Sequence, residues 1–331
     1  MMRRIQFEQF GDPSEVLHVV EGAEPTPGPG EVVVRVSVRP VHPADLLTVM
    51  GLYGVRPGLP ASPGLEGAGT IAALGSGVDG LVEGDRVVPI ISLREGGSWQ
   101  EFVTVPATRV LRIPEGLGDN AAAQTVVGPL TSWLMLTEYS EVSPGAWAIQ
   151  NAASGAMGRF NREVATSLGV HMIDVVRRSD AADALRNHGA SFVVDSSTED
   201  VVSQVTEFTG GRGVSVALDA VGGESGGQLL QTLASRGVHV LYGALSFQSL
   251  SVPVGKPIFS ELRVQGFWLD YWLRETPPAV QQKVFGHLLQ LMEKGEIAPQ
   301  AGPSFDLAEV VEAVRKASAP EGEAGKVLLV G

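Results

Sequence analysis

Glycines in the middle of the chain carry its clearest chemical signal. Gly155 and Gly158 follow the apolar run at residues 147–149, a pattern that predicts a buried strand turning tightly into a helix. At such a turn the backbone can approach a phosphate, and the N–H groups of the helix N-terminus point at it. Small residues at this place also serve close packing alone. The turn by itself therefore indicates a dinucleotide site only weakly.

The residues after the next apolar run indicate which dinucleotide would bind. Residues 172–176 predict a second strand, and Arg177 and Arg178 follow it directly. In dinucleotide-binding units this position meets the adenine ribose, where an acidic side chain binds the 2′-hydroxyl and a basic one accommodates a 2′-phosphate. Guanidinium groups pair with phosphate through parallel N–H donors. The sequence therefore predicts NADP(H) rather than NAD(H) as the cofactor.

Strands and helices alternate regularly after this segment. Further strands are predicted at residues 191–197, 214–223, 237–245 and 262–269, with helices at residues 181–188, 198–209 and 225–234. That alternation is typical of a doubly wound parallel sheet, which binds its ligands at the carboxyl ends of the strands.

The N-terminal part of the chain has a different pattern. Glycine and proline punctuate short predicted strands at residues 30–41, 67–75 and 85–91, which indicates a β-rich domain. An apolar helix at residues 120–138 follows, and Gly128 and Pro129 interrupt it.

The C-terminal part is predicted to contain two helices, the first at residues 278–293, and a terminal strand at residues 326–330. No internal repeat or low-complexity linker separates it from the rest of the chain. We expect residues 1–120 and 266–331 to combine into one domain, with residues 121–265 forming the nucleotide-binding domain.

Composition limits the possible partners. The chain has 331 residues, 44% of them hydrophobic and 18% charged, and a formal net charge of −13. The acidic balance argues against a nucleic-acid partner or an anionic membrane surface. The absence of cysteine excludes disulfides, thiolate metal ligands and a cysteine nucleophile. No signal core or membrane-length apolar segment is recognisable, so we expect a cytoplasmic protein without a membrane partner.

Motifs spread over nearly the whole chain share one resemblance. The strings PGEVVVRV, GLEGAGTI, GSGVDGLVEGDRV, AASGAMG and the closing GKVLLV are similar to those of the medium-chain dehydrogenase/reductase superfamily. The resemblance implies an α/β fold in which a GroES-like, β-rich catalytic domain accompanies a Rossmann nucleotide-binding domain with a doubly wound parallel sheet.

The sequence departs from the zinc-dependent alcohol dehydrogenases of that superfamily. Those enzymes carry a Gly-His-Glu motif and cysteine ligands, whereas this chain has Gly64-Leu65-Glu66 and no cysteine. His42 stands at a position expected for a catalytic cysteine, but one histidine beside Glu66 does not provide the three protein ligands of a catalytic zinc. We therefore expect no metal.

Within the zinc-free branch, the 2-enoyl thioester reductases look most similar. The similar segments are residues 42–60, 149–158, 174–178, 241–245 and 266–272. The resemblance implies NADPH-dependent reduction of the C2–C3 double bond of trans-2-enoyl-CoA or enoyl-acyl carrier protein, with hydride to the β-carbon and a proton to the α-carbon. A zinc-free quinone oxidoreductase with the same fold and cofactor is the nearest alternative. A non-catalytic NADPH-binding protein is a third.

The resemblance also assigns roles to single residues. Tyr53 is the implied proton donor or relay, although a loop tyrosine can also serve as an amphipathic cover. Phe267 and Trp268 either line the acyl pocket or fill core. The implied cofactor-binding residues are Ser154, Gly155, Ala156, Met157 and Gly158 at the phosphates, Arg177 and Arg178 at the 2′-phosphate, Tyr242, Gly243, Ala244 and Leu245 at the nicotinamide, then Phe267, Trp268 and Leu269, and Lys326.

Three departures from the enoyl reductase pattern stand out. His42 replaces an asparagine, Gly128 replaces another that is associated with cofactor binding, and residues 159–163 (RFNRE) replace a smaller and more apolar run. Arg159 or Arg162 could meet a cofactor phosphate, but the simpler interpretation places these charges on a solvated outer face of the helix.

Zinc-free members of the superfamily are commonly dimers. The aliphatic strand predicted at residues 237–245 would suit extension of the sheet across a two-fold axis. We therefore expect a homodimer that acts on a small-molecule or carrier-bound acyl thioester.

Overall fold

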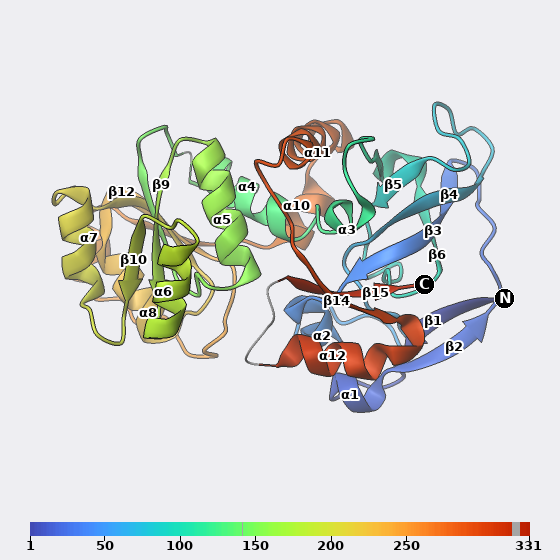
Figure 1. Ribbon diagram of the computed structural model, residues 1–331, viewed down its shortest axis with the longest axis horizontal. Coiled ribbons are helices and arrows are strands. Elements are labelled where there is room, and N and C mark those ends of the chain that lie inside the picture. Colours follow the sequence, from blue (N-terminus) through green and yellow to red (C-terminus); the bar gives the residue numbers. More distant parts are fainter. Residues whose placement is uncertain (141, 320–324) are drawn as a thin grey trace. The chain divides into compact units, whose positions relative to one another are not determined.

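The chain of the computed structural model, which describes residues 1–140, 142–319 and 325–331, divides into two units. The central unit is Thr131–Trp272, and the β-rich unit joins Met1–Leu130 to Leu273–Gly331 (Figure 1). Both breaks lie several residues after the expected domain boundaries, inside helices α4 (Gly128–Thr137) and α10 (Leu269–Glu275). The chain therefore passes from one unit to the other within helices.

A six-stranded parallel sheet lies at the centre of the central unit, with the strand order β10-β9-β8-β11-β12-β13. Its strands are β8 (Trp147–Gln150), β9 (His171–Val176), β10 (Phe192–Asp195), β11 (Val214–Asp219), β12 (Leu233–Leu241) and β13 (Arg263–Gly266). The predicted doubly wound parallel sheet is confirmed. Its order reverses between β8 and β11, and ligands bind at such a switch point, outside the carboxyl ends of the strands.

Helices follow these strands in chain order. They are α5 (Ala156–Ser167), α6 (Ser179–Asn187), α7 (Val201–Thr209), α8 (Gly223–Gln231) and the short α9 (Gly255–Phe259). Local signals set their ends. At the start of α7, for example, the Asp200 carboxylate accepts the Ser203 N–H, and Gly210 ends the helix with a φ of 59°. Buried aliphatic side chains of the strands and helices make the core, among them Ile149, Ile173 and Leu229.

The strand order corrects one expectation. β12 pairs with β11 on one side and with β13 on the other, so the strand predicted at residues 237–245 lies inside the sheet. It cannot extend the sheet into a second copy of the chain. The edges of this sheet are β10 and β13.

The β-rich unit contains a seven-stranded sheet and a two-stranded one. In the larger sheet the order is β14-β15-β3-β4-β5-β7, and β6 pairs with β3. The strands of the unit are β1 (Met2–Gln6), β2 (His18–Gly22), β3 (Glu31–Pro40), β4 (Ala68–Leu74), β5 (Arg86–Pro89), β6 (Phe102–Pro106), β7 (Val110–Arg112), β14 (Ala301–Asp306) and β15 (Lys326–Val330). The predicted terminal strand is β15, which pairs antiparallel with β3.

Helices of the β-rich unit are short apart from one. They are α1 (Pro13–Val16), α2 (Pro43–Val49), α3 (Asp119–Ala122), α11 (Pro278–Glu293) and α12 (Val310–Ser318), with 3-10 turns at Ala107–Arg109 and Leu307–Glu309. The break predicted at Gly128 and Pro129 is confirmed, because α3 ends before it and α4 begins at it. No helix in the described ranges is both long and apolar enough to cross a membrane.

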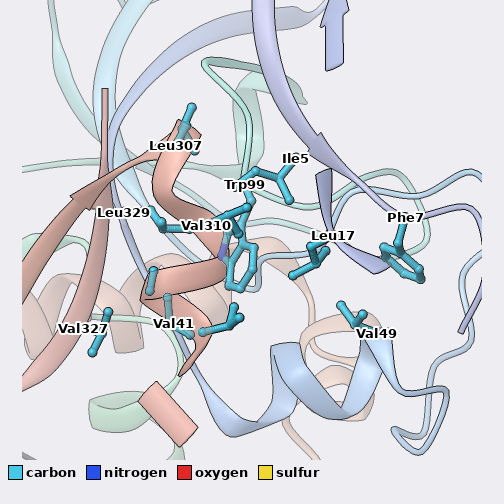
Figure 2. Packing of buried hydrophobic residues seen from close by; sticks show 12 residues of the cluster. Ile5, Phe7, Leu17, Val41, Val49, Trp99, Leu307, Val310, Val327 and Leu329 are labelled. Carbon is cyan, nitrogen blue, oxygen red and sulfur yellow. The ribbon is translucent and has the colours of Figure 1, made fainter. Parts of the chain in front are cut away.

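One core cluster of the β-rich unit draws on both ends of the chain. Trp99 is fully buried, and Ile5, Leu17, Val310 and Leu329 belong to the same cluster (Figure 2). Burying such side chains stabilises the fold by about 1.5–3 kcal/mol each. The C-terminal helix and strand are therefore part of the same core as β1.

Candidate functional site

The glycine turn lies between β8 and α5, at the carboxyl end of the sheet. Gly155 precedes the first helical residue, and Ser154 and Gly155 are exposed while Ala156 and Met157 are half-buried. Gly158 is buried, and a Cβ there would lie 2.2 Å from the Ala153 carbonyl oxygen, so no side chain fits. Gly158 thus allows the tight turn, and the residues before it present backbone to the outside.

The two arginines lie beside this turn. β8 and β9 pair in parallel, with Gln150 opposite Asp174, so both strands end at the same edge. Arg177 and Arg178 follow β9 and are exposed. The Arg178 Nε lies 3.1 Å from the Asp180 carboxylate, a partner that sequence reasoning missed although it stands two residues away. The turn and two guanidinium groups therefore share one edge, an arrangement that can hold a phosphorylated dinucleotide.

Residues after β12 and β13 reach the same edge. Tyr242 is half-buried and its backbone N–H donates to the Asp219 carbonyl (3.0 Å), while Ala244 and Leu245 are exposed. A Cβ at Gly243 would lie 2.5 Å from the Ala220 carbonyl oxygen, so this glycine serves close packing. The predicted nicotinamide segment thus lies on the carboxyl side of the sheet.

The aromatic residues after β13 are not alike. Phe267 is 7% exposed and its ring meets the edge of Tyr139 at 5.0 Å between centroids. Trp268 and Leu269 are half-buried. Phe267 is therefore packed in the core, and of the two rings Trp268 has the larger exposed surface.

Sequence reasoning missed a buried polar cluster at the ends of β8, β11 and β12. The Asp219 carboxylate accepts hydrogen bonds from Asn151 Nδ2 (2.6 Å) and from the N–H groups of Val221 and Gly222, and its other oxygen lies 2.9 Å from His239 Nε2. His239 is fully buried. The sequence feature that could have indicated this cluster is the position of its polar residues: Asn151 directly follows β8, and Asp219 is the last residue of β11. The cluster fixes the loop before α8.

The expectation for residues 159–163 was wrong. Asn161 is fully buried, and Arg162 NH1 donates to the Ala153 carbonyl (2.9 Å) and lies 3.1 Å from the Asp174 carboxylate. These side chains point into the unit because strand residues of β8 and β9 offer them polar partners. They do not form a solvated outer face.

Tyr53 and Lys326 belong to the β-rich unit. Tyr53 is half-buried in the loop after α2, and its N–H donates to the Leu47 carbonyl (3.1 Å). Arg56 of the same loop lies over the Phe10 ring at 4.7 Å. Lys326 begins β15, and its N–H donates to the Gln300 carbonyl (2.8 Å). The loop that presents Tyr53 is thus held at both sides of the tyrosine.

His42, Asp45 and Glu66 form a second buried group, named here the His42 cluster. His42 Nε2 lies 2.6 Å from Glu66 Oε1, and Glu66 Oε2 accepts the N–H groups of Val126 and Val127, just before α4. Burial lowers the pKa of His42, opposed by Glu66. Its neutral ring donates to the carboxylate, and the carboxylate in turn stabilises the N-terminus of α4.

Asp45 completes this cluster. One of its carboxylate oxygens accepts the His42 N–H (2.8 Å), and the other has no hydrogen-bond partner. Burial raises the pKa of Asp45 to about 7, and the charge of Glu66 adds to the effect. Among the residues that the structure describes, no three histidine, aspartate or glutamate side chains gather as ligands for a metal ion.

Two family models match parts of this chain. Residues 28–115 match the alcohol dehydrogenase GroES-like domain, and residues 156–284 match the family model described as zinc-binding dehydrogenase. The mitochondrial enoyl-[acyl-carrier-protein] reductases of Rattus norvegicus and Xenopus tropicalis are each 30% identical over 96% of this chain, which covers 86% and 92% of their lengths.

Solved structures extend the similarity to the whole fold. A protein assigned as an NADPH:quinone reductase in Bacillus thuringiensis has a TM-score of 0.91 at 33% identity, with 100% of this chain and 99% of that chain covered. An Escherichia coli quinone oxidoreductase in complex with NADPH has a TM-score of 0.86 at 26% identity, with 99% and 100% covered. The present chain matches both family domains and is similar to enoyl reductases over nearly its full length. It therefore belongs to the medium-chain dehydrogenase/reductase superfamily.

Proposed function

We propose that this oxidoreductase uses NADPH to reduce the C2–C3 double bond of trans-2-enoyl thioesters. The observation that carries the proposal is the common edge of the central sheet, along which lie an exposed glycine turn after β8, two exposed arginines after β9 and the segment after β12. The enoyl reductase relatives, which match 96% of the chain, support the choice of substrate.

The cofactor is assigned to this edge by charge and backbone geometry. NADPH supplies the hydride for the β-carbon. The N–H groups at the start of α5, with Ser154, Gly155, Ala156 and Met157, hold its pyrophosphate. Arg177 and Arg178 hold the 2′-phosphate, because no acidic side chain stands at the end of β9 itself. Residues 242–245 flank the nicotinamide.

Tyr53 supplies the proton. Reduction of an enoyl thioester leaves an enolate that must be protonated at the α-carbon, and a phenol held near that carbon can donate to it. The loop of Tyr53 is anchored by the hydrogen bond of its N–H to the Leu47 carbonyl and by Arg56 over the Phe10 ring. Leu52 and Leu59 of that loop are 61% and 40% exposed and offer apolar surface to an acyl chain.

A quinone oxidoreductase is the second candidate. The solved structures with the same fold and higher than one-quarter identity include quinone reductases, one of them in complex with NADPH. A quinone needs the same hydride but no proton at an α-carbon. The two functions therefore make different demands on Tyr53.

Turnover by the purified protein tests the proposal. NADPH oxidation is followed with crotonyl-CoA, with the matching carrier-protein thioester and with 1,4-naphthoquinone, each against NADH as the control cofactor. The proposal expects fast turnover with a thioester and little with the quinone. Robust quinone turnover without thioester turnover would reverse the order. Tight NADPH binding without turnover on any acceptor would assign the chain to the non-catalytic binding proteins.

The assembly that we propose is a homodimer, with β13 as the contact strand. β13 is an edge of the central sheet, and Val264 on it is 43% exposed. Nearby in the sequence, Phe247, Ile258 and Phe259 are 77%, 65% and 87% exposed, an unusual amount of large apolar surface for one region. Light scattering checks the mass, and a monomer at micromolar concentration contradicts this assembly.

A further inference from the structure

A chain of buried polar side chains lies beneath the glycine turn. Ser132, Gln150 and Asn161 are fully buried and Asp174 is 1% exposed. Ser132 Oγ donates to Asn161 Oδ1 (2.6 Å), Asn161 Nδ2 to Gln150 Oε1 (2.8 Å), and Gln150 Nε2 to Asp174 Oδ1 (2.6 Å). Each amide uses both its oxygen and its nitrogen, so the side chains are fixed relative to one another.

This network holds the two ends of the turn. Gln150 Nε2 also donates to the Gly158 carbonyl (2.9 Å), and Arg162 NH1 bridges the Ala153 carbonyl (2.9 Å) and Asp174 Oδ1 (3.1 Å). Ala153 and Gly158 are the residues that touch where the turn closes. Asp174 therefore connects both ends of the turn to β9, the strand that ends in Arg177 and Arg178.

Tyr242 lies next to the far end of the network. Burial raises the pKa of its hydroxyl, and the neighbouring Asn161 side chain opposes that shift. Because Tyr242 begins the segment assigned to the nicotinamide, the network extends from the neighbourhood of that segment to the phosphate turn within a single unit.

Arg162 is the one charged side chain among the neighbours of Asp174 that the structure describes. Arg162 of α5 faces it, β8 contributes the neutral amide of Gln150, and Val193 of β10 is its neighbour in the sheet. The buried residues of α6 are the apolar Ala182 and Leu185. Burial raises the pKa of Asp174 to about 6, although Arg162 and Gln150 oppose it, and its second oxygen has no hydrogen-bond partner.

We propose that Asp174 is a positioning residue for the cofactor: ionised, it holds Gln150 and Arg162 on the carbonyls of the glycine turn, and protonated, it releases them and weakens the binding of NADP(H). The inference rests on the proposed function in one respect, that the turn receives the cofactor's phosphates. Arg162 can leave because its side chain is already 22% exposed. None of these side chains needs to touch the cofactor.

The test is the Kd of NADP⁺ for the wild type and Asp174→Asn between pH 5 and pH 8, measured by calorimetry. Asparagine keeps an oxygen for Gln150 and Arg162 but carries no charge. The 2′-phosphate itself titrates near pH 6, so the quantity compared is the ratio of the two Kd values. We expect Asp174→Asn to bind about tenfold more weakly at pH 8 and within about twofold at pH 5, because the wild type is then itself protonated. A ratio that does not change with pH overturns the inference.

Two further variants keep the test decisive if Asp174→Asn folds poorly. Arg162→Gln removes the positive charge that opposes protonation of Asp174. The pH midpoint at which NADP⁺ affinity falls should therefore be higher in Arg162→Gln than in the wild type, whereas Arg162→Lys should leave this midpoint nearly unchanged. Equal midpoints in the wild type and Arg162→Gln would contradict the inference. Asp200→Asn is the matched control, because Asp200 caps α7 in the same unit and asparagine caps equally well.

The outcomes also separate this inference from the proposed function. If the wild type binds neither NADP⁺ nor NADPH at any pH, the proposed function fails. If the wild type binds both and the ratio is constant with pH, only the role of Asp174 fails. A merely structural role for Asp174 would lower the melting temperature without a pH-dependent ratio of Kd values.

Discussion

At the carboxyl edge of the central sheet the charged side chains of Arg177 and Arg178 are exposed, whereas in the His42 cluster Asp45 and Glu66 are fully buried. The exposed guanidinium groups keep N–H donors available for a ligand. The buried carboxylates bind backbone N–H groups or an imidazole of their own unit. Because a buried charge needs such partners, the comparison separates groups that recognise a ligand from groups that hold the backbone.

Tyr53→Phe tests the ligand-directed side of this comparison with the largest expected effect. The change keeps the ring and removes the proton donor, so kcat with an enoyl thioester should fall about 100-fold, while the KM for NADPH stays the same. Tyr271→Phe, at a residue 53% exposed on α10, is the control. Full activity of Tyr53→Phe would exclude the proton-transfer role.

The double variant Arg177→Ala with Arg178→Ala removes both exposed charges. Hydrogen bonds to charged groups contribute about 1.5 kcal/mol or more each, so the Kd of NADPH should rise about 100-fold. The Kd of NADH, which lacks the 2′-phosphate, should change little. Arg186→Ala on α6 is the control, because Arg186 pairs with Asp183 on the same helix. Equal losses for both cofactors would show that the arginines do not recognise the 2′-phosphate.

Gly158→Ala addresses backbone contact instead of charge. The added Cβ would lie 2.2 Å from the Ala153 carbonyl oxygen, so the turn must shift, and we expect a loss of about 2 kcal/mol in the free energy of unfolding. At Gly155 the nearest atom to such a Cβ is 3.5 Å away, so Gly155→Ala should stay within about 0.5 kcal/mol. Chemical denaturation measures both. Equal losses would mean that the close approach at Gly158 does not matter.

Asp45→Asn tests the buried side of the comparison. Since the folded-state pKa of Asp45 is raised to about 7, its contribution to stability is full below the unfolded value near 4 and is lost as pH rises through 7. Asparagine does not titrate, so the melting temperature of Asp45→Asn relative to the wild type should be higher at pH 8 than at pH 5. Asp79 is exposed, and the melting temperature of Asp79→Asn should differ from that of the wild type by the same amount at pH 5 and pH 8. A difference for Asp45→Asn that is also equal at the two pH values would contradict the prediction.

The sequence predicted what depends on local pattern. The strand and helix alternation of the central unit, the helix at 278–293 and the terminal strand at 326–330 follow from periodicity and from turn residues, and the structure has them. The glycine turn could be recognised for a similar reason, because the close approach at Gly158 requires a glycine whatever surrounds it.

What depends on distant partners could not be predicted in the same way. The polar run at residues 159–163 has the composition of a solvated face, and only Gln150 on β8 and Asp174 on β9 make its interior position favourable. The place of β12 inside the sheet depends on the order of strands, which periodicity does not encode. The resemblance placed His42 beside Glu66, but the contacts of Glu66 with Val126 and Val127 escaped for the same reason, since those residues are sixty positions away.

The pairing of β15 with β3 has a consequence for synthesis on the ribosome. The last residues of β3, Val38–Pro40, lack their partner until residues 326–330 have been made, whereas Thr131–Trp272 has all six of its strands much earlier. Because domains generally fold as units during translation, the middle of this polypeptide can reach its native state first, while the N-terminal third stays incomplete until the last strand is released.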